Sequence, residues 1–198
     1  MLATRPCPSP DPWIDGCKIL DTHLDAPLTA VPGFSTMISV NQIPQGKADS
    51  ERIGREVTVR RLSSRFWITG DVTSTGAVYA RMVIFRDRQF GGVSVSPAVL
   101  LQSNLITAHQ NRFNRDRFEI LYDETFLMDA VNHITATDYL HLQTPLQACV
   151  LDMDLTLFFS SASALSVRGN NIGVVWVVQA SSNNTYFHGD FRLFYTDF

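Results

Sequence analysis

Apolar and polar side chains alternate one by one through most of the chain after Gly33, and this period of two constrains the fold more than any other feature. Successive side chains of a strand point to opposite faces of a sheet, so the alternation predicts half-buried strands. The clearest strand candidates are residues 34–43, 55–68, 77–85, 117–127, 150–159, 172–180 and 187–198. Only the stretch "VSPAVLLQSN" favours a short helix, with Pro97 at its first position. The pattern predicts an all-β fold.

The segment "REVTVRRLSSRFWI" changes phase in its middle. Val57 and Val59 occupy odd positions, whereas Leu62 and the apolar residues after it occupy even ones. One extra residue in a strand produces such a change, so we expect a β-bulge at Arg60 and Arg61.

Residues 1–33 differ from the rest, because they hold six of the nine prolines and show no sustained apolar period. We interpret this segment as an extended proline-rich arm, and residues 34–198 as one folded domain. A chain of 198 residues with 45% apolar residues is long enough to bury a large core. Three scattered cysteines, the absence of a secretory pattern and the absence of a long apolar run predict a protein with no disulfide framework and no membrane partner.

The net charge of −3 hides an arginine-rich middle. Between Lys47 and Arg117 the chain has 12 basic residues against 6 acidic ones, a net charge of +6, whereas the remainder has 4 basic and 13 acidic residues and a net charge of −9. Such a segment faces either a polyanion or the acidic part of a neighbouring subunit. The candidate nucleic-acid-binding residues are Arg55, Arg60, Arg61 and Arg65.

A second group of charged residues flanks a long connection between two strands. The connection follows the buried strand "AVYARMVIF" and contains most of the stretch "NRFNRDRF". Connections of this length usually carry a function, and we expect contacts between subunits here. The candidate interface residues are Arg86, Asp87, Arg88, Arg112 and Arg115.

Catalytic and metal-binding patterns are weak in this sequence. Asp152 and Asp154 share one face of a strand and are the best candidates for holding a cation, but no third ligand stands at a fixed offset. No GxSxG, Walker, GxGxxG or HExxH motif occurs, and Cys149 has no base near it in sequence. The sequence therefore predicts a protein that is not an enzyme and needs no cofactor.

The order of several short motifs resembles the capsid proteins of small circular Rep-encoding single-stranded DNA viruses, of the geminivirus, nanovirus and circovirus types. The motifs are "VNQIPQGKADSERIGREVTVRRLSSRFWI", "VYARMVIFRDRQFGG", "SPAVLL" and "RFEILYDETF", and they span residues 38–127. The sequence departs from that family in one respect, since residues 1–33 contain only Arg5 and Lys18 as basic residues. Neutralisation of packaged DNA by a basic arm is therefore not expected from this segment.

The resemblance implies an eight-stranded antiparallel jelly-roll sandwich whose copies assemble into an icosahedral shell around single-stranded DNA, within a virion. The eighth strand is expected near Val93–Val95 or Ala164–Val167. A coat protein of a small or satellite RNA virus would have the same architecture. A trimeric jelly-roll binding module and a cupin-type enzyme are the alternatives from other classes. The former usually has a signal peptide or paired cysteines, and the latter needs a histidine–carboxylate cluster.

Overall fold

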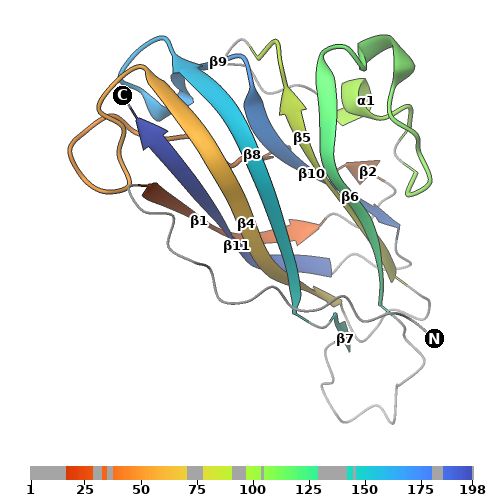
Figure 1. Ribbon diagram of the computed structural model, residues 1–198. Helices are drawn as coiled ribbons and strands as arrows, with labels where there is room; N and C mark the ends of the chain where they lie inside the picture. The colour runs from red at the N-terminus through yellow and green to blue at the C-terminus, as the bar shows by residue number, and fades with distance from the viewer. Residues whose placement is uncertain are drawn as a thin grey trace.

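The computed structural model consists of two antiparallel β-sheets packed face to face (Figure 1). It describes residues 17–28, 33–34, 38–70, 78–90, 97–103, 105–128, 142–144, 146–179 and 185–197. The first sheet has the order β1 (Lys18–Leu28), β11 (Thr185–Asp197), β4 (Glu56–Gly70), β8 (Gln147–Phe159) and β9 (Val167–Arg168), and β7 (Leu142–Gln143) pairs with β4. The second sheet has the order β2 (Gly33–Phe34), β10 (Asn171–Gln179), β5 (Val78–Asp87) and β6 (Phe118–Met128), and β3 (Ile38–Ser39) pairs with β10.

The strand order is that of a jelly roll. When β2 and β3 are taken as two pieces of one strand and the short β7 and β9 are set aside, the sheets have the orders 1-8-3-6 and 2-7-4-5 in chain numbering. These orders arise when a long hairpin of four strands against four is rolled up, so that strand 1 pairs with 8, 2 with 7, 3 with 6 and 4 with 5. The expected all-β jelly-roll sandwich is confirmed.

The first strand of the sandwich lies inside the segment that the sequence assigned to an arm. β1 pairs with β11 along its whole length, from Lys18 opposite Tyr195 to Leu28 opposite Thr185. Its proline, Pro27, is tolerated because β1 is an edge strand, where one side needs no ladder hydrogen bonds. Proline content thus concealed a true strand, and the boundary at residue 33 cuts through the sheet.

The eighth strand is therefore β1 and lies at neither expected position. Of the two, residues 93–95 lie outside the part of the chain that the structure describes. At the other, a short 3₁₀ helix, η2 (Ala164–Ser166), precedes the two-residue β9. The short helix expected at Pro97 is present as α1 (Pro97–Leu100).

The expected bulge in β4 is confirmed. The register of β4 against β8 shifts between Val59 and Arg61, and its register against β11 shifts at the same place. Beyond the bulge, Leu62, Phe66 and Ile68 are buried between the sheets. The odd-numbered side chains of β4 after the bulge consequently point away from the core.

Aromatic side chains join the two sheets. The ring of Phe66 lies 5.7 Å from that of Trp176, 5.4 Å from that of Phe126 and 5.5 Å from that of Phe187, measured between centroids. Phe66 and Phe187 belong to the first sheet, and Trp176 and Phe126 to the second. Gly189 makes room for this cluster, because a Cβ added there would lie 2.6 Å from the Cβ of Phe66 and 2.9 Å from the carbonyl oxygen of Arg65.

We expect Gly189→Ala to lower the free energy of unfolding by about 1–3 kcal/mol, because overpacking forces side chains and backbone to shift. Urea denaturation followed by tryptophan fluorescence measures the loss. Gly46→Ala is the control, since its new Cβ would meet only the movable carboxylate end of Glu51. Equal losses in the two variants would contradict the role of Gly189 in the packing of the aromatic cluster.

Candidate functional site

The outer face of the first sheet, on the side away from the second sheet, is the candidate site. Side chains from β1, β11 and β4 form rows across it, because the three strands are paired in register. The rows are Asp21–Arg192–Ser63, His23–Asp190–Arg65 and Asp25–His188–Trp67. We call these nine residues, together with Tyr186 and Thr69 of the next row, the polar face.

Three cross-strand pairs of opposite polarity connect β1 to β11 on the polar face. The pairs are Asp21 with Arg192, His23 with Asp190, and Asp25 with His188. Arg192 donates two hydrogen bonds to the carboxylate of Asp21, at 2.7 and 2.8 Å. The Nδ1 of His23 lies 2.7 Å from Asp190, and this hydrogen bond raises the pKa of His23, with the charges of Asp190 and Asp25 adding to the effect. Two of the three pairs thus depend on a histidine.

Aromatic rings lie beside these pairs. The ring of Trp67 stacks on that of His188, with centroids 5.3 Å apart and planes inclined by 14°, and the ring of Tyr186 follows at 6.4 Å. The hydroxyl of Thr69 lies 3.0 Å from the Nε2 of His188 and fixes the orientation of the imidazole. The result is a row of three rings on the sheet surface, a suitable platform for flat ligands such as unpaired bases.

A polar hollow of about 380 Å³ lies beside this ring row, lined by Asp21, Ser63, Arg65, Asp190 and Arg192. Arg65 is exposed, and its guanidinium makes no hydrogen bond or ion pair with another residue in the part of the chain that the structure describes. The guanidinium of Arg65 can donate hydrogen bonds to a phosphate, and the rings beside it can stack on bases. Proteins that bind single-stranded nucleic acids combine these two kinds of group.

The other predicted nucleic-acid residues have different surroundings. Arg60 donates to Asp154 at 2.5 Å, and Arg61 donates to Asp152 at 2.6 Å. Asp152 and Asp154 are thus partners of arginines rather than a cation site, and no group of three metal-ligating side chains gathers in the described ranges. Arg55 is exposed just before β4 and lies apart from the polar face. The structure brings none of the other three arginines next to Arg65 on the polar face.

Sequence reasoning missed the aromatic part of the polar face. Trp67 follows Arg65 by two residues, so the alternation places both on one face, and this signal was available. Tyr186 and His188 come from a strand about 120 positions later, and only the register of β4 against β11 shows that they are neighbours.

The long connection between β5 and β6 is fastened to the second sheet by two arginines, Arg81 on β5 and Arg117 just before β6. Asp87 is completely buried and accepts two hydrogen bonds from Arg117, at 2.8 and 2.7 Å. Arg81, which is 9% exposed, donates to both oxygens of Asp123 and to the carbonyl oxygens of Ile106 and Ala108. The contacts of Arg81 fasten the described part of the connection near Ile106 and Ala108 to β5.

The predicted interface residues have three different kinds of surroundings. Asp87 does not fit a subunit contact, because it is buried and its oxygens are occupied within the chain. Arg86 and Arg88 both donate to Glu119 and lower the pKa of its carboxyl, Arg88 having the larger effect. Arg88, Arg112 and Arg115 have exposed side chains, and those of Arg112 and Arg115 lie farther along the connection.

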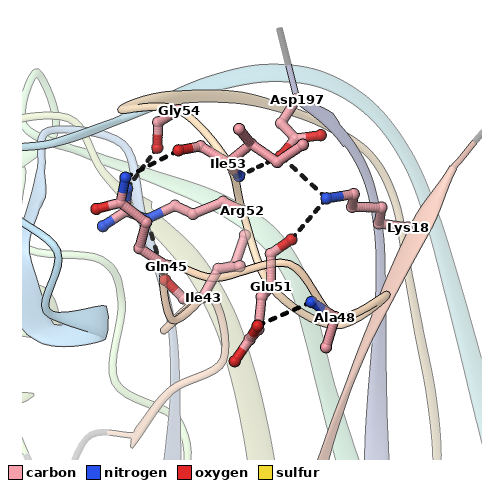
Figure 2. A network of polar contacts seen from close by, with 9 residues as sticks. All are labelled: Lys18, Ile43, Gln45, Ala48, Glu51, Arg52, Ile53, Gly54 and Asp197. Carbon is pink, nitrogen blue, oxygen red and sulfur yellow. Dashed lines mark hydrogen bonds and ion pairs between the residues drawn. The ribbon is translucent and has the colours of Figure 1, made fainter.

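A second buried arginine fastens the segment that leads into β4, as Figure 2 shows. Arg52 is fully buried, donates to the carbonyl oxygens of Ile43, Gly54 and Ser161, and lies 4.0 Å over the ring of Phe159. Burial lowers the pKa of Arg52, yet its donors are matched by carbonyl oxygens. Asp197 completes the network.

The Asp197 carboxylate, near the end of β11, accepts from the backbone NH of Ile53 at 2.5 Å and from Lys18 at 3.2 Å (Figure 2). Lys18 also donates to the carbonyl oxygen of Glu51. The network therefore connects the start of β1, the segment before β4 and the end of β11. It stabilises the fold and offers no open site.

The thiol of Cys149 is a poor nucleophile. Cys149 is buried, and desolvation raises the pKa of its thiol to about 12, so the thiolate is scarcely populated near neutral pH. Among the described residues, no helix is long and apolar enough to cross a membrane.

Fold and site together define the chain as an eight-stranded jelly roll with an aromatic and charged outer face. No family model and no curated protein matches it. Among solved structures, a chain from Desmodium yellow mottle tymovirus aligns over 98% of this chain and 95% of that one, with a TM-score of 0.37 and 7% sequence identity. A likeness this distant assigns no family.

The attachment of β1 is expected to weaken as the pH rises. The folded state raises the pKa of His23 above its ordinary value of about 6.5. The ion pair of His23 with Asp190 therefore stabilises the pairing of β1 fully below that value, and this stabilisation is lost as the pH rises through the raised pKa. Hydrogen-exchange protection factors of the β1 amides should therefore fall as the pH rises from about 6.5 through the raised pKa of His23. His23→Gln should reduce this pH dependence, whereas a fall of the same size in the variant would exclude His23 as its source.

Proposed function

We propose that the protein is a non-enzymatic coat-protein subunit, whose copies assemble into an icosahedral shell around a single-stranded DNA genome in a virion. The jelly roll alone does not decide this, because the same fold serves many functions. The observation that carries the proposal is the connection between β5 and β6, which hydrogen bonds from the buried Arg81 fasten to the sheet and which presents exposed arginine and apolar side chains to solvent. Arginine and aromatic residues are enriched in protein–protein interfaces.

The polar face is the proposed surface for nucleic acid. Arg65 supplies a free guanidinium, and the row of Trp67, His188 and Tyr186 supplies stacking surface. Duplex DNA hides the faces of its bases, whereas single strands expose them, so this combination favours a single-stranded genome. The choice of DNA over RNA rests on the motif order between residues 38 and 127, and a coat protein of an RNA virus is the alternative.

Assembly is tested on the purified full chain by sedimentation velocity and negative-stain electron microscopy, with and without single-stranded oligonucleotide. Closed particles, formed more readily in the presence of oligonucleotide, are expected. A stable monomer at all concentrations and salt conditions would contradict the proposal. Parallel titrations with DNA and RNA of one sequence separate the two kinds of genome.

Arg65→Ala and Trp67→Ala are expected to weaken binding of a short single-stranded oligonucleotide to the unassembled chain. Loss of one stacked base costs about 1–3 kcal/mol, which corresponds to roughly 5- to 150-fold in Kd for Trp67→Ala. Arg65→Ala should also reduce the slope of log K against log salt by about 0.7. Arg115→Ala removes an exposed arginine elsewhere and is the matched control. Equal losses in all three variants would indicate a nonspecific charge effect and contradict binding at the polar face.

A further inference from the structure

Phe113 is presented to solvent in a turn that is held in place by hydrogen bonds. Its side chain is 97% exposed, at the centre of the 3₁₀ helix η1 (Arg112–Asn114). The side chain of Asn111 accepts from the backbone NH of Phe113 at 3.1 Å, and that of Asn114 donates to the carbonyl oxygen of Val99 at 2.9 Å. The turn is therefore fixed against α1 while its phenyl ring remains in water.

Such an arrangement is typical of a binding residue. Exposed apolar surface is unfavourable by about 25 cal/mol per Å², so burial against a partner would stabilise the 97% exposed ring of Phe113. The flanking residues Arg112 and Arg115 are also exposed. An aromatic side chain between arginines has the composition of an interface hot spot, and the fixed turn reduces the entropy that binding would cost.

A small hollow elsewhere on the subunit has the size and chemistry to receive a phenyl ring. It has a volume of about 210 Å³ and is lined on its apolar side by Phe90, Ala164, Leu165 and Val167. A cavity of about 150 Å³ already accommodates benzene in a protein interior. Leu165 is 63% exposed, so the hollow lacks cover on that side.

A polar group at the same hollow also lacks a partner. Asn171 is fully buried there, and its Nδ2 donates to Ser39 at 3.1 Å, but its Oδ1 has no hydrogen-bond partner within the described ranges. Buried acceptors are nearly always paired in folded proteins, so this oxygen indicates a missing donor.

We infer that Phe113 of one copy of this chain inserts into the hollow beside Leu165 of a second copy. The partner is a second copy because one chain carries both parts, and because the 97% exposure of Phe113 shows that its own hollow does not hold it. Each copy then uses its ring toward one neighbour and its hollow toward the other. This head-to-tail contact deepens the proposed function. It rests on that proposal for the closed shell, since heterologous contacts close into rings only when the rotation between copies allows it.

The area of the contact determines what it can hold together. An aromatic side chain buries about 150–250 Å², whereas a stable pair needs about 800 Å² on each partner. One such contact is therefore too small to maintain an isolated dimer. It fits a ring or shell, in which every copy is held on both sides and the contacts act together.

Photo-crosslinking tests the contact directly. The full chain with benzoylphenylalanine at position 113 is mixed with isotope-labelled chain, irradiated during assembly, and digested for mass spectrometry. Crosslinks between copies that join position 113 to peptides containing Phe90 or residues 160–168 are expected. Particles that form with crosslinks elsewhere, or with none, would overturn the inference and leave the coat-protein proposal standing. The expected crosslinks without particles would support the contact and contradict the shell.

Phe113→Ser provides a second measurement, because an exposed position leaves folding intact. We expect the concentration needed for assembly to rise at least tenfold, with an unchanged circular dichroism spectrum and an unchanged melting temperature. The matched control is Leu127→Ser on β6, which removes an apolar side chain that is 54% exposed and lies outside the turn. An equal rise in both variants would reduce the effect to general surface hydrophobicity and overturn the inference.

Discussion

The aromatic contact between the two sheets is the interaction on which the rest of the structure depends. Phe66 meets Trp176 across the sandwich, and Phe187 packs against both rings. Because side chains alternate along a strand, burying Phe66 also fixes Arg65 and Trp67 on the outer face. A slip of one residue in β4 would exchange the two sets of side chains, so the core packing also determines the register of the polar face.

Three arginines in or near the core fasten connecting segments to the sheets. Arg52, Arg81 and Arg117 each hold a segment that would otherwise leave the sheets, through carbonyl oxygens or a carboxylate. Arg52 and Arg81 are buried, so removing the oxygens that accept from them would leave a buried charge without compensation, which is destabilising. The exposed turn around Phe113 belongs to the connection that Arg81 holds, and hydrogen bonds of Asn111 and Asn114 fix it locally.

The local pattern of apolar and polar residues was sufficient to predict part of the fold. The alternation predicted the main strands, and the change of phase at Arg60 and Arg61 predicted the bulge, because both are properties of neighbouring residues. β1 was hidden by Pro27 and the other prolines of residues 1–33, since only the sheet shows that it lies at an edge. The partners of Arg60 and Arg61 depend on pairing between β4 and β8, about 90 positions apart, and no local pattern contains that register.

Two surfaces of the sandwich are available for different partners. The polar face covers the first sheet, whereas α1 and η1 belong to the connection fastened to the second sheet through Arg81 (Figure 1). Packed sheets are about 10 Å apart, so a ligand on one outer face does not touch the other. A subunit of the proposed kind must contact copies of itself while it holds nucleic acid. The two-layer fold meets this requirement, because strands that share one core present their outer faces in opposite directions.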